Sequence, residues 1–218
     1  EQGGSDLFLS VGTAGQIKIE GITQPVNERQ LRPGDVRAMA YQVMSQRQID
    51  EFERDLEMNL AVSVSSKARF RVNVYYQRGE VSMVIRMIQS TIPAIADLGL
   101  PAQLEKLAML DRGLILIVGP AGSGKSTTLA AMLEHRNQQK SGHIVCIEDP
   151  IEFIHQHRLS VIDQREVGLD THSFSDALRN VLREAPDVIM LGEIRDLDTM
   201  QNALHYAETG HLCLATLH

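Results

Sequence analysis

The chain has 218 residues, of which 43% are hydrophobic and 22% are charged, an ordinary globular composition that leaves room for two modest domains. No stretch approaches the roughly 18 uncharged apolar residues that a membrane-spanning helix needs. Residues 1–112 hold 13 Lys or Arg and 14 Asp or Glu, whereas residues 113–218 hold 8 and 14, so most of the net charge of −7 falls on the second part. An acidic second part argues against a broad nucleic-acid surface, which requires a basic stripe.

The beginning of the chain mixes strand and helix patterns. Apolar spacing predicts two short strands followed by two helices, at residues 6–11, 17–20, 33–43 and 46–56. Ser45 and Gln48 form a capping-box pattern at the start of the second helix. Both cysteines, Cys146 and Cys213, lie in apolar runs and are expected to be buried free thiols, as in a reducing compartment.

A β-hairpin is predicted from the alternation of residues 68–75 and 81–88, with a turn near Arg78 and Gly79. Arg71 lies on the polar face of the first strand and Arg86 on the polar face of the second. If both apolar rows face the core, the two arginines emerge together. The spacing leaves two interpretations open, a solvated polar face and a functional pair of arginines.

Glycine and proline within residues 92–101 indicate turns, and a helix is predicted directly afterwards, at residues 102–110. Beyond Gly113, strand and helix patterns alternate, which is typical of a mostly parallel sheet flanked by helices. We therefore expect an N-terminal domain, a linker with lead-in, and a second domain, at residues 1–100, 101–112 and 113–218.

A phosphate cradle is indicated by residues 119–126, Gly-Pro-Ala-Gly-Ser-Gly-Lys-Ser, which match GxxxxGK[ST] between a strand pattern and a helix pattern. Glycines permit positive φ, so that successive N–H groups can point inward, and the helix adds its positive end. We expect Lys125 to reach the β- and γ-phosphates and Ser126 to bind Mg²⁺. The nucleotide-binding set is Gly119, Pro120, Ala121, Gly122, Ser123, Gly124, Lys125, Ser126 and Thr127. An incidental glycine-rich turn is the alternative.

Two apolar runs downstream of the cradle end in acids, at Glu148 and at Glu193. Hydrolysis needs one carboxylate near the Mg²⁺ shell and another to orient water. We expect Glu193 at the tip of a strand beside the cradle strand, although solvated strand ends are the alternative. His211 and His218 flank a further apolar run, where a histidine could touch a γ-phosphate or could simply be a satisfied polar residue.

Longer strings resemble a known family, the secretion-superfamily motor ATPases. Ile147-Glu-Asp-Pro-Ile-Glu-Phe153 is similar to their Asp box, Gly192-Glu-Ile-Arg-Asp196 to their Walker B segment, and residues 209–218 to their His box. Gly3-Gly-Ser-Asp-Leu7 and residues 68–74 and 164–167 resemble the type IV pilus retraction ATPases, the PilT/PilU group. Details at residues 154–157, 165–171 and 212–216 are closer to the PilU type.

This resemblance implies an α/β fold, with an N-terminal PAS-like α+β domain followed by a RecA-like P-loop ATPase domain whose C-terminal part is truncated here. It also implies a hexameric ring that hydrolyses ATP with Mg²⁺ to power pilus retraction and twitching motility. Such a motor would work in the cytoplasm, peripheral to the inner membrane. Its partners would be its own copies, a sister retraction ATPase and an inner-membrane platform protein, with no nucleic acid.

The resemblance also implies roles for individual residues. Those expected to be catalytic are Lys125, Glu148, Glu193, His211, His218, Arg71 and Arg86, and those expected to hold Mg²⁺ are Ser126 and Glu193. Two alternatives from other classes remain open: a non-hydrolytic nucleotide-binding adaptor that modulates a sister ATPase, and a DNA translocase, which the acidic second part disfavours.

Overall fold

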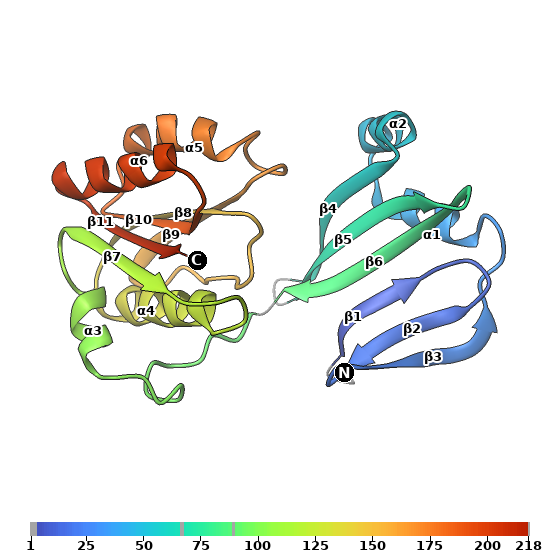
Figure 1. The fold of residues 1–218 in the computed structure, drawn as a ribbon, viewed down its shortest axis with the longest axis horizontal. Helices are drawn as coiled ribbons and strands as arrows, with labels where there is room; N and C mark the ends of the chain where they lie inside the picture. Colours follow the sequence, from blue (N-terminus) through green and yellow to red (C-terminus); the bar gives the residue numbers. More distant parts are fainter. Residues whose placement is uncertain (1–3, 66–67, 89, 218) are drawn as a thin grey trace. The chain divides into compact units, whose positions relative to one another are not determined.

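The computed structural model describes residues 4–65, 68–88 and 90–217, and the chain divides into two compact units, Glu1–Ile88 and Gln89–His218 (Figure 1). The division falls earlier than the expected boundary at residue 100. Its physical reason is that Ile95, Leu98 and Leu104 pack into the core of the second unit. Residues 101–112, the expected linker and lead-in, therefore lie within the C-terminal unit.

The N-terminal unit is a six-stranded sheet with two helices. In chain order its elements are β1 (Gly4–Leu9), β2 (Ala14–Ile19), β3 (Ile22–Gln30), α1 (Asp35–Val43), α2 (Gln46–Asp55), β4 (Glu57–Ser65), β5 (Ala68–Gln77) and β6 (Glu80–Ile88). The strand order is β3-β2-β1-β6-β5-β4, and every neighbouring pair is antiparallel. Both helices pack on one face of this sheet, where Val36, Phe52 and Val74 are fully buried.

Local sequence explains most of these elements. The predicted capping box is present, because Ser45 accepts from the Gln48 amide while the Gln48 side chain accepts from the Ser45 amide. The hairpin is also present, and Arg71 lies directly opposite Arg86 in its register. Strands β3 and β4 were not predicted. Strand β3 is exposed along its whole length, so no buried face imposes an apolar alternation on its sequence.

The C-terminal unit is a parallel sheet between two helical layers. Its elements are α3 (Gln103–Ala108), β7 (Gly113–Val118), α4 (Lys125–Gln139), β8 (Gly142–Glu148), β9 (Ser160–Glu166), α5 (Phe174–Val181), the 3₁₀ turn η1 (Leu182–Glu184), β10 (Val188–Ile194), α6 (Leu197–Glu208) and β11 (Leu212–Leu217). The strand order is β7-β11-β10-β8-β9, with all neighbouring pairs parallel. Strand β9 was not predicted, and it lies at the edge of the described sheet.

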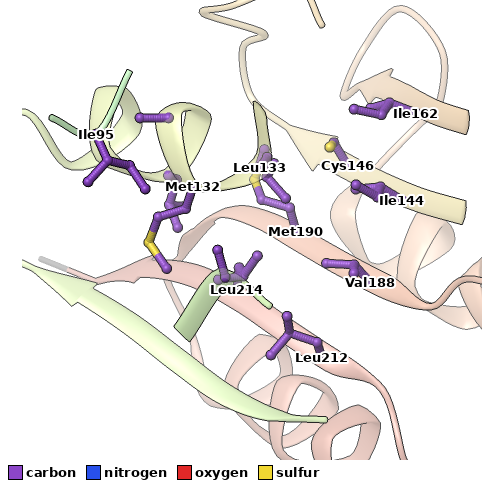
Figure 2. Close-up of a cluster of buried hydrophobic side chains, with 13 residues drawn as sticks. Ile95, Met132, Leu133, Ile144, Cys146, Ile162, Val188, Met190, Leu212 and Leu214 are labelled. Carbon is purple, nitrogen blue, oxygen red and sulfur yellow. The ribbon is translucent and has the colours of Figure 1, made fainter. Parts of the chain in front are cut away.

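Alternate residues of the strands fill two separate cores. Val145 and Ile189 face α5 and α6, whereas Cys146 and Met190 face α3 and α4. Figure 2 shows the second of these cores, with Met132 and Leu133 of α4 among side chains of the strands. In Figure 1 the helix pairs α5–α6 and α3–α4 cover opposite faces of the sheet. The parallel arrangement brings the carboxyl ends of all five strands to one edge.

Both cysteines are buried free thiols, as expected. Burial raises the pKa of the Cys213 thiol to about 12. Within the described parts of the chain, no helix combines the length and the apolar character that a membrane span requires.

Candidate active site

The glycine-rich turn joins the carboxyl end of β7 to α4, as the sequence predicts. Gly122 and Gly124 have φ of 75° and 90°, values that disfavour any residue with a Cβ, and α4 begins at Lys125. The Lys125 ammonium curls back over the turn, where Nζ donates to the carbonyls of Gly119 at 2.8 Å and Pro120 at 3.0 Å. The turn therefore has the backbone shape and the cation that a phosphate cradle requires.

A cavity of about 370 Å³ opens beside this turn at the carboxyl edge of the sheet. Its polar and charged lining comes from the cradle, from the ends of three strands and from the loop after β8, and it includes Lys125, Ser126, Thr127, Glu148, Asp149, Glu152, His155, Glu193 and Thr216. Of the expected nucleotide-binding set, Ala121, Gly122, Gly124, Lys125, Ser126 and Thr127 line the cavity. Gly119, Pro120 and Ser123 belong to the turn but not to this lining.

Glu148 ends β8 and is almost fully buried at the floor of the cavity. Burial raises the pKa of its carboxyl group to about 7, against the opposing effect of a hydrogen bond from Gln164, whose Nε2 lies 2.9 Å from Glu148 Oε1. The neighbouring charges of Glu152 and Glu166 act in the same direction as burial. A carboxyl group with a pKa near neutrality is suited to accept and release a proton.

Glu193 lies near the end of β10 and is linked to the loop after β8 through an arginine. Arg195 Nε donates to Glu193 Oε2 at 2.8 Å, and Arg195 Nη1 donates to Asp149 Oδ2 at 2.9 Å. The expectation that this strand lies directly beside the cradle strand is wrong, because β11 is inserted between β7 and β10. Glu193 nevertheless lines the same cavity as Lys125.

Gly192 allows β8 and β10 to meet closely at this edge. A Cβ at this position would lie 3.2 Å from Glu148 Cα, closer than ordinary van der Waals contact. The carbonyl of Gly192 accepts a 2.6 Å hydrogen bond from Thr216 Oγ1 on β11. Thr216 thereby ties the inserted strand to the strand that carries Glu193.

The loop between β8 and β9, residues 149–159, forms one wall of the cavity and is fastened to α4. Asn137 is fully buried, and its Nδ2 donates to the Gln156 carbonyl at 2.7 Å while its Oδ1 accepts from the Arg158 and Ser160 amides. Burial disfavours the ionised form of Glu134, but the contact with His155 and hydrogen bonds from Gln138 and Arg158 lower its pKa to about 2. An ionised Glu134 therefore anchors the same loop.

Of the two histidines in the expected His box, only His211 lies within the described residues. His211 precedes β11 at the amino edge of the sheet, opposite to the cradle, and its Nδ1 lies 3.2 Å from the Tyr206 carbonyl. It lines a separate cavity with Asp111 and Arg136, so the structure does not bring it to the cradle. The physical reason is that His211 precedes β11, whose parallel direction puts its amino end at the edge of the sheet opposite to the carboxyl ends. His218 lies outside the described residues.

Arg71 and Arg86 belong to the N-terminal unit, where they face each other on the strand face opposite to the helices. Arg86 Nε donates to Asp6 Oδ1 at 2.7 Å, and the Asp6 side chain is 8% exposed while that of Arg86 is 68% exposed. The sequence prediction that the two arginines share one face is confirmed by this register.

The residues present fit a nucleotide with Mg²⁺ better than a metal ion held by the protein alone. Within residues 4–65, 68–88 and 90–217, no cluster of three or more His, Cys, Asp or Glu side chains could hold a metal ion. The Ser126 hydroxyl and the Glu193 carboxylate, both on the cavity wall, are hard oxygen donors of the kind Mg²⁺ uses together with substrate phosphates.

Comparison with known proteins agrees with this geometry. The sequence profile of the family described as "Type II/IV secretion system protein" matches residues 2–218. The chain belongs to this family. It is 51% identical over 218 residues to the type IV pilus ATPase PilU of Pseudomonas aeruginosa and 45% identical over 218 residues to the retraction ATPase PilT of the same organism. The resemblance to the PilT/PilU group of this family, and to PilU within that group, is confirmed.

The alignments cover 100% of the chain but only 57% of PilU and 63% of PilT, so the chain spans less than two thirds of the length of these relatives. A crystal structure of the pilus retraction motor PilT with bound ADP superimposes with a TM-score of 0.94 at 46% identity, covering 100% of the chain and 64% of that structure. The α/β fold with its parallel sheet is thus that of a PilT-like family member.

Some residues of this family member's site were not found by sequence reasoning. Two of them are uncharged amides that hold the site together: Gln164 bonds the Glu148 carboxylate, and Asn137 bonds the Gln156 carbonyl. The third is Arg195, which bridges the carboxylates of Glu193 and Asp149. Gln164 and Arg195 lie inside strings that carry the resemblance, but motif spacing alone assigns no role to them. Only the register of β8 and β9 brings Gln164 close to Glu148.

Proposed function

We propose that this chain is the ATP-binding and ATP-hydrolysing part of a pilus retraction motor. The observation that carries the proposal is the cavity that Lys125, Glu148 and Glu193 line together. A cradle alone would serve nucleotide binding of any purpose. Two carboxylates from two different strand ends, one of them buried with a pKa near 7, add the groups that hydrolysis requires.

In the proposed bound state, the inward amides of residues 119–127 hold the phosphates and Lys125 exchanges its contacts with the turn for the β- and γ-phosphates. Ser126 and Glu193 would hold Mg²⁺, which when bound neutralises phosphate charge in this acidic surrounding. The Arg195 bridge keeps Glu193 in place at the cavity wall.

Glu148 is proposed to orient the attacking water and to take its proton as the water attacks the γ-phosphate in line. The carboxyl group is held at the buried end of β8, within a cavity wall to which the half-buried Gly192 and Glu193 of β10 also contribute. Lys125 would offset the charge that develops on the transferred group. Glu152 also lines the cavity and is a reserve candidate for a nearby role.

Arg71 and Arg86 are proposed to act on the nucleotide, as the family resemblance implies, by stabilising the charge of phosphoryl transfer. Support comes from their register: the two side chains face each other on the strand face opposite to the helices, and Arg86 is mostly exposed. His218 is also proposed to be catalytic, as the His box of the family implies.

The motor itself is proposed to be a hexameric ring in the cytoplasm, peripheral to the inner membrane. Its RecA-like C-terminal unit and PAS-like N-terminal unit would close on each other as ATP is hydrolysed, and the movement would be passed to a membrane-embedded platform protein. A sister retraction ATPase would be a second partner. The similarity to PilU, a type IV pilus ATPase, and to PilT, a type IV pilus retraction ATPase, supports this assignment.

The test is the ATPase rate of the full-length protein that contains this chain, with Glu193→Ala as the control. We expect wild type to hydrolyse ATP and the variant to lose nearly all of that activity. Identical rates would overturn the hydrolase and favour a nucleotide-binding adaptor instead. Sizing of the full-length protein with and without an ATP analogue tests the ring, because a strict monomer in both conditions contradicts it.

A further inference from the structure

Gln164 uses both ends of its side-chain amide behind three residues that line the cavity, Glu148, Phe153 and His155. Its Nε2 donates to Glu148 Oε1 at 2.9 Å and to the Phe153 carbonyl at 2.8 Å, while its Oε1 accepts from the His155 amide at 2.9 Å. Because donor and acceptor ends are both engaged, the amide has a single favourable orientation. Gln164 therefore links the end of β8 to the middle of the loop 149–159.

The strand register explains how Gln164 reaches Glu148. In the parallel pair of β8 and β9, Gln164 is the partner of Cys146, and Glu166 is the partner of Glu148. Residues two positions apart on one face of a sheet lie within diagonal reach of a long side chain. Gln164 thus meets the carboxyl group of Glu148 across the strands, on the same face as Cys146.

We propose that Gln164 is a positioning residue, which holds the Glu148 carboxylate and the cavity-wall loop in the geometry required for water attack. This inference rests on the proposed function, because it names the group that orients the proposed catalytic acid–base residue. The role requires a side chain that donates to Glu148 and also accepts from the His155 backbone amide, and the uncharged amide of Gln164 does both.

The surroundings of Glu148 make its proton affinity sensitive to this bond. The charged or titratable groups that share its cavity or act on it are Lys125, Asp149, Glu152, His155, Glu166 and Glu193. Burial raises the pKa of Glu148, and the Gln164 bond is the largest opposing influence. Loss of that bond should raise the pKa further, because a hydrogen bond to the ionised form is removed.

The experiment compares wild type, Gln164→Leu and Gln164→Glu in the full-length protein, measuring kcat, the Kd for ATP and the pH dependence of kcat. Asp163→Asn is the matched control, because it lies next along β9 but contacts His143 instead of Glu148. We expect both Gln164 variants to bind ATP within about twofold of wild type, and kcat to fall about tenfold. The acid limb of the pH profile of kcat should move to higher pH in both Gln164 variants. The shift should be larger in Gln164→Glu, because a second carboxyl group then faces Glu148.

These measurements distinguish a failure of the positioning role of Gln164 from a failure of the proposed ATP hydrolysis. A wild type that is no faster than Glu193→Ala overturns the proposed hydrolysis and the positioning role together. A wild type that hydrolyses ATP, with Gln164 variants whose acid limb is unmoved, overturns the positioning role alone. A loss of kcat matched by an equal loss of ATP affinity also overturns it, since general loosening of the cavity explains that result. If Gln164→Leu does not fold, the near-isosteric Gln164→Glu decides.

Discussion

Asp6 accepts a 2.7 Å hydrogen bond from Arg86, which joins β1 to β6 in the N-terminal unit by a charged pair. Burial of the Asp6 carboxyl group favours its neutral form, but the bonds from Arg86 and Ser5 overcome this effect and lower its pKa. The acid end of the pair is covered and the guanidinium end is exposed. The buried Asp6 carboxylate therefore holds the guanidinium group of Arg86, the proposed catalytic arginine, in a fixed position.

Asp6→Asn should destabilise the full-length protein at pH 7 by about 1 kcal/mol, a value at the low end for a charged hydrogen bond because Arg86 is exposed. A carboxyl group with a lowered folded-state pKa stabilises the fold above its unfolded pKa of about 3.8, and this contribution is lost as pH falls through the folded value. The difference from wild type should therefore shrink in acid. Urea titrations at several pH values measure the difference in the free energy of unfolding between the variant and wild type. Glu28→Gln, at an exposed position, is the control. Equal effects of the two substitutions at pH 7 would contradict a stabilising pair of Asp6 and Arg86.

Glu148→Gln should stabilise the protein at pH 8 while abolishing hydrolysis. The folded-state pKa of Glu148 is raised from 4.5 to about 7, so its favourable contribution is complete below pH 4.5 and is lost as pH rises through 7. A neutral amide avoids the cost of the buried charge, which amounts to about 1–3 kcal/mol at pH 8. Thermal unfolding at pH 5 and pH 8 checks this: a gain in Tm at pH 8 that is absent at pH 5 is expected, and equal Tm changes would refute the raised pKa.

Asn137→Ala should loosen the loop 149–159 from α4. The substitution removes the buried side chain that bonds the Gln156 carbonyl and the Arg158 amide of the loop and the Ser160 amide of β9, at a cost of about 2–4 kcal/mol. Hydrogen exchange should accelerate at the amides of Arg158 and Ser160. Gln139→Ala, an exposed position on the same helix, is the control, and unchanged exchange in Asn137→Ala would show that the loop is held by other contacts.

Gly192→Ala should impair both stability and hydrolysis, because its Cβ meets the backbone of Glu148 at 3.2 Å. Moving a strand end by a few tenths of an ångström costs about 1–3 kcal/mol and displaces the carboxyl group. Gly15→Ala is a matched control: its Cβ would meet only the Leu9 Cδ2 atom, at 3.0 Å, which a side-chain adjustment relieves. Equal Tm and equal ATPase rates for the two variants would argue against the close approach.

Local sequence predicted the parts of the site that depend on neighbours along the chain. The cradle residues 119–126, the acids Glu148 and Glu193 at strand ends, and the pairing of Arg71 with Arg86 all follow from spacing and alternation. Each of these features is determined within one turn, one strand or one hairpin.

The features that local sequence did not predict depend on the order in which strands assemble. Strand β11 enters the sheet between β7 and β10, which separates Glu193 from the cradle strand, and its parallel direction places His211, which precedes it, at the edge opposite to the cradle. The roles of Asp6 and Gln164 likewise arise from pairings across strands. Apolar alternation predicts which face of a sheet a residue occupies, but it does not predict which strand will be the neighbour of the strand that carries the residue.

The proposed role of Glu148 is tested most directly by measuring ATP affinity and ATP hydrolysis together in the full-length wild type and in Glu148→Gln. We expect the Kd for ATP to change less than about threefold, because the cradle and Lys125 are untouched. We expect kcat to be at least about 100-fold lower, because the proton acceptor is lost. A Glu148→Gln variant that hydrolyses ATP as fast as wild type would contradict this role.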